Sequence, residues 1–212
     1  LQEDPYNRID WHKKLPRADR GDYAFIMHIA KQLKRPDQDG EGGKASIVIP
    51  HGVLFRKHEQ RYRKPMLEND MVEAIVGLPE NLFQNNSIPS GILVLNTDKP
   101  AEREDEVQFI HAADEDFYEE LSNQNELTDA GLDHIVENFR EWATEERVSR
   151  TVPLDEIREN DYNLNIALYV DTTEPEEDID VQEELRKLQE LQAERDEIES
   201  QMNQHMGALN YE

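Results

Sequence analysis

Residues 42–97 read GGKASIVIPHGVLFRKHEQRYRKPMLENDMVEAIVGLPENLFQNNSIPSGILVLNT, and three short apolar runs punctuate this stretch. Runs of about five aliphatic residues between Gly, Pro and Asn predict strands covered on both faces, because such strands have no polar side to show. The loop between the second and third runs is too short for a helical crossover, so these two strands should be antiparallel. The stretch predicts an α/β fold with a parallel sheet closed by one antiparallel hairpin, its strands at 45–49, 72–78 and 91–95.

Composition limits what this sheet can belong to. The 212-residue chain has no cysteine, which excludes disulfide frameworks, thiolate zinc sites and cysteine nucleophiles. No apolar run reaches about 18 residues and no signal-like segment opens the chain, so we expect a cytoplasmic protein without a membrane partner. The histidines lack metal-ligand spacing and an obvious nucleophile partner, so we assign no metal site and no catalytic residue.

Charge is divided unevenly along the chain. The formal net charge is -25, yet residues 1–64 hold 14 of the 23 basic residues and only 9 of the 48 acids. A strongly acidic chain is a poor match for DNA phosphates, but a locally basic part allows a division of labour. Adaptation of the surface to high salt and an acidic tail on an ordinary protein are both compatible with the acidity.

The flanks of the first strand contain two helices. The segment 22–34 predicts a helix that Asp22 caps, with a buried face at Ile26, Ile29, Ala30 and Leu33. The glycines at 40–43 follow this helix and open a strand, which is the wrong context for a nucleotide-binding loop. A second helix is expected at 59–67, kinked or shortened by Pro65.

The second helix brings the densest basic cluster of the chain. A solvated helix face is the ordinary interpretation of such a cluster, and contact with DNA phosphates is the alternative that the surrounding acidity favours. The phosphate-binding candidates are Arg56, Lys57, Arg61 and Lys64.

Three parts are expected: a partial sheet domain at 1–112, a helical accessory region at 113–170, and an acidic linker with a coiled-coil-like helix at 171–212. Residues 1–20 read as a loop anchored by Trp11, and further elements are expected at 107–112 (strand), 129–144 (helix) and 153–157 (short helix). The last helix, 181–206, has an incomplete apolar seam that needs a partner helix in cis or in trans. The seam consists of Val181, Leu185, Leu188, Leu191, Ile198, Met202 and Met206, and Arg195 interrupts it.

Four runs in order carry a family resemblance. They are ASIVIPHGVLF (45–55), IVGLPENLF (75–83), IPSGILVLN (88–96) and ENDYNLNIALYV (159–170). With these runs the chain resembles the modification subunit of type I restriction-modification systems, an adenine-specific DNA methyltransferase. The resemblance implies a Rossmann-like class I methyltransferase sheet with a reversed final hairpin, followed by a helical tail.

Two motifs of that family are missing from this chain. Its members bind S-adenosylmethionine on a glycine-rich loop after the first strand and hold the target adenine with an Asn-Pro-Pro-Phe-type motif. The chain therefore resembles the carboxy-terminal half of the enzyme, and we expect it to be inactive alone and to bind S-adenosylmethionine only as part of the full-length enzyme.

The resemblance also implies site residues and partners. Tyr23 and Phe25 correspond to the cofactor-binding helix, although core packing is an equal alternative for Phe25. Phe83, Pro89 and His51 belong to the region that faces a base flipped out of the duplex, as methylation of a stacked adenine requires. The implied partners are DNA, the specificity subunit and the restriction subunit. A non-catalytic acidic module that binds a helical partner is the alternative function.

Overall fold

The computed structural model describes residue 16, residues 20–36, 41–84 and 86–172, and nine residues between 185 and 202. The chain forms two compact units, residues 1–172 and 173–212. The expected anchor Trp11, the 37–40 turn and most of the acidic linker lie outside the described residues. None of the helices among the described residues has the length and apolar character that a membrane span requires.

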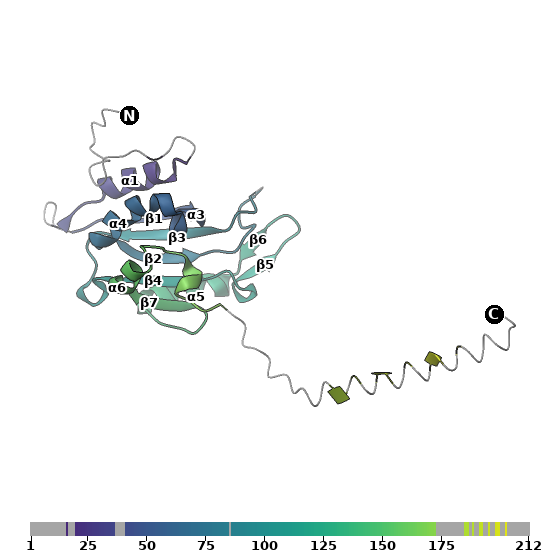
Figure 1. Cartoon of the computed structure of the whole chain (residues 1–212). Helices are drawn as coiled ribbons and strands as arrows, with labels where there is room; N and C mark the ends of the chain where they lie inside the picture. Colours follow the sequence, from purple (N-terminus) through teal and green to yellow (C-terminus); the bar gives the residue numbers. More distant parts are fainter. Residues whose placement is uncertain are drawn as a thin grey trace. The chain divides into compact units, whose positions relative to one another are not determined.

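A five-stranded mixed sheet forms the middle layer of the first unit (Figure 1). Its order is β1 (Lys44–Pro50), β3 (Ser90–Asn96), β2 (Val72–Gly77), β4 (Glu106–His111) and β7 (Ser149–Pro153). β3 is antiparallel to both β1 and β2, and β4 is parallel to β2 and antiparallel to β7. The predicted β2–β3 hairpin is confirmed. The prediction of an otherwise parallel sheet is wrong, because β7 adds a second reversed strand and β1 pairs with the reversed β3.

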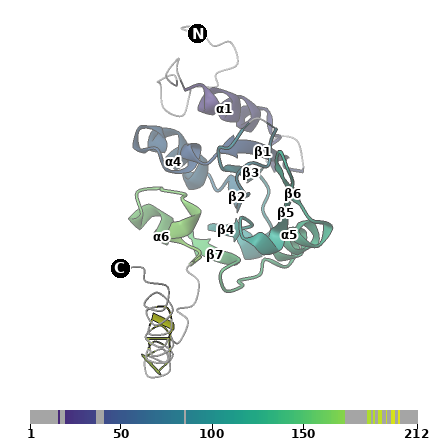
Figure 2. The same cartoon turned by 90° about the vertical axis from the view of Figure 1, so that its right-hand side faces the viewer.

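Helices cover both faces of this sheet, which gives three layers (Figure 2). On one face lie α1 (Asp22–Gln32), α3 (Gly52–Phe55), α4 (Gln60–Glu68) and α6 (Leu154–Glu159), and on the other lies α5 (Asp129–Glu141). Successive strand residues alternate between the two cores, since Ile75 packs in the larger one and Val76 in the smaller one. The remaining elements are η1 (Lys57–Glu59), η2 (Ala101–Arg103), η3 (Glu115–Phe117), η4 (Ile166–Leu168) and the hairpin β5 (Tyr118–Glu120) with β6 (Asn125–Leu127).

The strands differ in how completely they are covered. β2 is buried along its whole length and β3 along most of it, as their apolar runs predict. In β1 only Ile49 is fully buried, and 57% of Val48 is exposed. The prediction that 45–49 is covered on both faces is therefore wrong, because among the described strands β1 pairs with β3 alone and forms an edge of the sheet.

α1 begins differently from the sequence-based expectation. Its N-cap residue is Gly21, and Asp22 makes no capping bond. Instead, Asp22 Oδ2 accepts a hydrogen bond from Arg56 Nη1 at 3.1 Å, which ties α1 to the segment after α3. The core-facing side chains are Tyr23, Ile26, Met27 and Ala30, whereas the expected Ile29 and Leu33 are half-buried.

Two further helices follow the expected pattern with changed ends. α4 runs through Pro65 and ends three residues later, at Glu68. α5 starts at a Thr128 cap, whose hydroxyl accepts from the Gly131 N–H at 3.0 Å, and ends where Trp142 adopts a left-handed conformation. The strand β7 lies within 113–170, the region that was expected to be a helical accessory part. This whole region lies in the same compact unit as residues 1–112.

The described residues of the second unit are all helical. Their apolar side chains are 46–63% exposed and fall on seam positions: Leu185, Leu188, Leu191, Ile198 and Met202. Val181 and Met206 lie outside the described residues. A continuous helix over 181–206 and a partner for its seam stay predictions.

Candidate functional site

One edge of the sheet gathers most of the site residues that the sequence suggests. β1 and β2 run in the same direction because both are antiparallel to β3, and β4 is parallel to β2. Their carboxyl ends therefore meet at one edge, where open α/β sheets place ligands. His51 follows β1, the loop 78–89 follows β2, and His111 ends β4. This edge is called the carboxyl edge below.

His51 is the most unusual polar side chain of the carboxyl edge. Its backbone N–H donates to Pro89 O at 3.1 Å, which fixes the loop end beside β1. Its ring nitrogen Nε2 is buried and has no hydrogen-bond partner among the residues that the structure describes. Burial, and secondarily the charge of His111, lower the pKa of His51 below its ordinary value, so the imidazole is neutral at pH 7. A neutral ring keeps one nitrogen as donor and the other as acceptor.

Two glycines of neighbouring strands lie beside this imidazole. A Cβ at Gly91 would lie 3.5 Å from His51 Cδ2 and 2.9 Å from Val76 O, and one at Gly77 would lie 3.6 Å from His51 Nε2. The Cβ at Gly77 would also meet Ile166 Cδ1 at 2.6 Å. A Cβ at either position would meet the ring at an ordinary van der Waals distance, whereas Val76 O and Ile166 Cδ1 would be too close, so the glycines serve close packing against these two groups.

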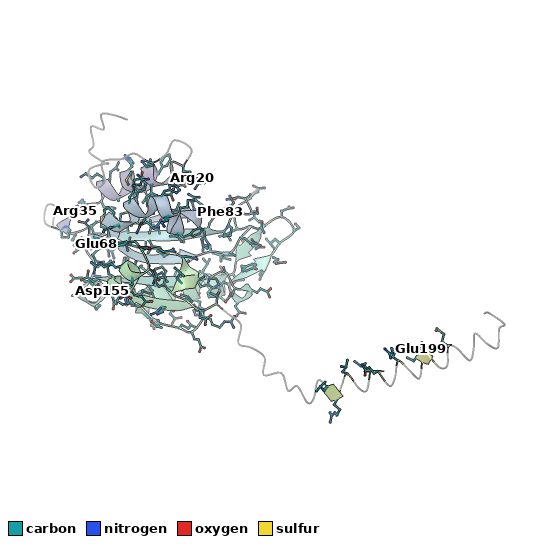
Figure 3. The ribbon with its side chains drawn as sticks, in the orientation of Figure 1. Arg20, Arg35, Glu68, Phe83, Asp155 and Glu199 are labelled. Atoms are coloured by element: carbon teal, nitrogen blue, oxygen red, sulfur yellow. The ribbon has the colours of Figure 1, made fainter. Side chains whose placement is uncertain are left out.

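The loop 78–89 presents apolar side chains to solvent. The exposed fractions are 41% for Phe83 and 58% for Ile88. Figure 3 shows Phe83 at the opposite end of the sheet layer from Glu68, where α4 ends. Asn125 of β6 steadies the loop, because its side-chain amide donates to Glu80 O at 2.9 Å and its backbone N–H to Asn81 O at 2.8 Å. Phe83 therefore stands on a loop that two hydrogen bonds anchor to β6.

The two expected cofactor residues point in different directions. Tyr23 is 1% exposed, its hydroxyl donates to Val53 O at 3.1 Å, and its ring stacks on Tyr62 at 5.1 Å between centroids. Burial raises the pKa of Tyr23 far above its ordinary value. Phe25 is 72% exposed. In this conformation Phe25 offers a free ring face to a ligand and Tyr23 does not.

The four phosphate candidates differ in how far other protein groups already occupy their charged ends. Arg56 pairs with Asp22, and Arg61 donates through Nε to His58 O at 2.8 Å. Lys64 Nζ lies 5.1 Å from the centre of the Tyr162 ring. The Lys57 side chain is exposed and forms no hydrogen bond or ion pair with another described residue. Of the four, Lys57 is the cation most available to an incoming anion.

Arg63 is a residue that the sequence reasoning left out of the site. It lies in the same basic cluster but is 1% exposed. Its guanidinium donates to three backbone carbonyls, those of Tyr162 (2.8 Å), Val53 (3.1 Å) and Arg56 (3.1 Å). Its position four residues before Leu67, on the apolar stripe of α4, is the signal that could have separated it from its exposed neighbours.

Metal binding finds no support in this geometry. Among the residues that the structure describes, no group of three or more His, Asp or Glu side chains is placed to hold an ion. Of the two histidines at the carboxyl edge, His111 is engaged with Asp114, whose Oδ1 lies 3.1 Å from His111 Nε2.

Comparison with known proteins places the chain in a family. Residues 1–178 match the family described as N-6 DNA Methylase. The type I restriction enzyme MjaVII methylase subunit of Methanocaldococcus jannaschii is 41% identical over 157 residues, which are 73% of this chain and 27% of the relative. The MjaVIII methylase subunit of the same organism is 36% identical over 188 residues, 86% of this chain and 31% of the relative.

A solved structure agrees with these relatives. The type I restriction-modification methyltransferase subunit from Streptococcus thermophilus superposes with a TM-score of 0.70 at 37% identity, over 80% of this chain and 34% of that one. The chain thus spans about a third of the length of the proteins that it matches. From the family match over most of its residues and from these relatives, the chain belongs to the N-6 DNA methylase family, as a relative of type I restriction-modification methyltransferase subunits.

Proposed function

We propose that the chain is part of an adenine-specific DNA methyltransferase subunit of a type I restriction-modification system. When bound, S-adenosylmethionine would supply the methyl group for the exocyclic amine of the adenine. The observation that carries the proposal concerns two segments that leave the carboxyl edge. One bears the exposed Phe83, and the other bears the buried His51 Nε2, which has no hydrogen-bond partner in the described part of the chain. Identities of 36–41% to type I methylase subunits support it.

The carboxyl edge suits a base that has left the duplex. A flipped adenine has an apolar ring face and a polar edge, so its site needs an apolar surface for the face and hydrogen-bonding groups for the edge. Phe83 supplies an aromatic face, and stacking on such a side chain is worth about 1–3 kcal/mol per base. His51 Nε2 is a buried nitrogen to which no other described residue hydrogen-bonds, and a base edge that enters between the loops would supply a partner. Pro89, bonded through its carbonyl to His51, would set the width of that entrance.

The strand order favours a Rossmann-like methyltransferase sheet. β1 and β2 run in the same direction, and the reversed strand β3 lies between them. A reversed strand in this place is what the closing hairpin of that fold requires. We propose that the sheet continues in the part of the subunit that the longer relatives contain and residues 1–212 do not. Catalysis would need that part, so we expect the chain alone to show no methyl transfer and no binding of S-adenosylmethionine.

The second unit suggests the contact with the other subunits. Its described seam residues are apolar and 46–63% exposed, and such a surface calls for a helical partner. We propose the specificity subunit as that partner and, through the assembled complex, the restriction subunit. Deleting residues 173–212 should abolish co-purification with the specificity subunit, and undiminished co-purification would contradict this assignment.

The base-stacking role of Phe83 can be tested directly. In the methyltransferase subunit that contains residues 1–212, Phe83→Ala should lower methyl transfer and the fluorescence rise of a 2-aminopurine placed at the target adenine. Phe83→Trp should keep both, because the stacking face is retained. Leu121→Ala, on the neighbouring β5–β6 turn and 48% exposed, is the matched control.

The outcomes also separate the two candidate functions. Unchanged methyl transfer and fluorescence in Phe83→Ala would remove the base-stacking assignment. A subunit that binds its helical partner but transfers no methyl group to DNA would favour the alternative, a non-catalytic interaction module. The strong acidity of residues 65–212 supports this alternative, because an acidic surface is a poor match for DNA phosphates.

A further inference from the structure

A polar pocket of about 390 Å³ lies between the start of α4 and the turn that follows α6. Phe55 forms part of its rim, and this residue ends α3, the short helix that begins directly after His51. The Leu164 N–H donates to Leu54 O at 2.9 Å, which joins the two sides of the pocket. The polar lining residues are Lys57, Gln60, Arg63, Asn160, Asp161 and Asn163.

Arg63 gives this pocket a buried positive charge. The three acceptors of its guanidinium are neutral carbonyls, and no carboxylate among the described residues forms an ion pair with it. The nearby acid Glu59 is shared between Arg56 (3.5 Å) and His58 (3.7 Å). A buried charge is costly unless an opposite charge or full hydrogen bonding compensates it. The three carbonyls compensate Arg63 by hydrogen bonding, and an anion in the pocket would add the opposite charge that they do not carry.

The other lining groups add donors. Lys57 is exposed and has no partner among the described residues. Asn163 uses its side-chain oxygen to accept from the Asn165 N–H at 3.0 Å, which leaves its amide nitrogen for a ligand. Asp161 is the one acidic lining residue, so two cations outweigh it.

The far wall is held in place by specific bonds. Asp161 and Tyr162 both have φ of +54°, a left-handed conformation that costs a non-glycine residue about 1–2 kcal/mol. The Tyr162 hydroxyl donates to Glu68 Oε1 at 2.6 Å, and Arg158 forms a two-pronged ion pair with the same carboxylate at 3.0 and 2.8 Å. The wall is therefore anchored to the carboxyl end of α4 and keeps its shape without a ligand.

We propose that this pocket binds a backbone phosphate of DNA through Lys57, Arg63 and the Asn163 amide, and so positions the duplex beside the carboxyl edge. The proposal rests on the proposed function, because DNA is the phosphate source that a methyltransferase of this family meets. It narrows the four phosphate candidates to Lys57, adds Arg63 from the same basic cluster, and adds Asn163, which is remote in sequence. Arg56, Arg61 and Lys64 are not part of it, since none of the three lines the pocket.

Salt dependence of DNA binding tests the phosphate contact. In the subunit that contains residues 1–212, Lys57→Gln should make the slope of log affinity against log salt less steep by about 0.9. Between roughly 50 and 200 mM salt, the affinity of the variant should therefore fall by a factor that is about 3.5 times smaller than the factor for wild type. The effect should be the same for duplexes of different sequence. Lys44→Gln is the matched control, because Lys44 is exposed at the opposite end of β1.

A second variant, Asp161→Asn, should change DNA affinity in the opposite direction to Lys57→Gln. Asp161→Asn should raise DNA affinity by removing the one negative charge of the lining, and asparagine tolerates the left-handed conformation at this position. Arg63 is left unchanged in these tests, because its three carbonyl bonds hold α4 to its neighbours. A lower affinity of Asp161→Asn, or equal slopes for Lys57→Gln and Lys44→Gln, would overturn the proposal.

Inorganic phosphate separates failure of the pocket from failure of the function. In a titration of the 212-residue chain, phosphate should shift the NMR signals of the Arg63 Nε–H and the Asn163 amide in wild type and less in Lys57→Gln. Phosphate shifts without any DNA binding by the subunit would refute the proposed function and the DNA source together. DNA binding with no effect of Lys57→Gln and no phosphate shifts would refute the pocket alone.

Discussion

Replacing Tyr169 by phenylalanine removes one hydroxyl from the junction between the 159–170 run and the sheet. The Tyr169 and Phe109 ring centroids are 4.3 Å apart, and the Tyr169 hydroxyl donates to Asn163 O at 2.5 Å. Burial, as the largest cause, raises the pKa of Tyr169 from 10.0 to about 12. The variant keeps the packed ring and loses only the hydrogen bond and the ionisable group.

The expected effect on stability changes sign with pH. At neutral pH the variant should be less stable by about 1 kcal/mol, the usual net contribution of one hydrogen bond. The wild-type tyrosine has a raised pKa in the folded state, so its contribution is full below pH 10 and is lost as the pH rises through about 12. With these two pKa values the wild type should lose about 1.4 kcal/mol of stability by about pH 11, slightly more than its advantage of about 1 kcal/mol at neutral pH. The two stability curves should therefore cross at about pH 11.

Urea unfolding of the 212-residue chain and of the variant, at neutral pH and in steps up to about pH 11, measures this difference. The difference in tyrosinate absorbance between the two proteins checks that Tyr169 ionises late. Two stability profiles that stay parallel from neutral to alkaline pH would refute the reasoning, because the hydroxyl would then ionise equally easily in the folded and unfolded chains.

Three further outcomes follow from the same structure. Hydrogen bonds from Arg158 and Tyr162 lower the pKa of Glu68 from 4.5 to about 2, so the stability that ionised Glu68 contributes should be lost as the pH falls from about 4.5 to about 2. In Glu68→Gln, the free energy of unfolding measured with urea should depend less on pH over this range. Thr128→Ala removes the N-cap of α5 and should cost about 1 kcal/mol, whereas Thr128→Ser should cost little in the same assay. Gly91→Ala brings a Cβ within 2.9 Å of Val76 O, and because a backbone oxygen cannot step aside we expect a loss of about 1–3 kcal/mol, measured by the thermal midpoint.

The sequence predicted the elements of the sheet better than their surroundings. The apolar runs located β1, β2 and β3 closely, because aliphatic runs between turn residues are a strong local signal. The same signal cannot tell a central strand from an edge strand, so β1 was expected to be buried although Val48 is 57% exposed. β7 has the sequence SRTVP, which is short and polar, and only its pairing with β4 makes it a strand.

The candidate site shows the same division between local and tertiary information. Sequence reasoning found a basic cluster but could not rank its members, because the pairing of Arg56 with Asp22 and the burial of Arg63 depend on packing. The ENDYNLN run was known only by resemblance. The structure gives it a physical role, since its Tyr162 carbonyl holds Arg63 and its Asn163 lines the pocket.

The edge position of β1 has a consequence for amide hydrogen exchange. Among the described strands, β1 has seven residues that pair with β3 on one side only. In an antiparallel pair, successive residues point their N–H groups alternately toward and away from the neighbour. Exchange along β1 should therefore alternate between slow and fast, apart from Pro50, which has no N–H to exchange. Uniformly slow exchange would reveal that another strand has docked along the open side.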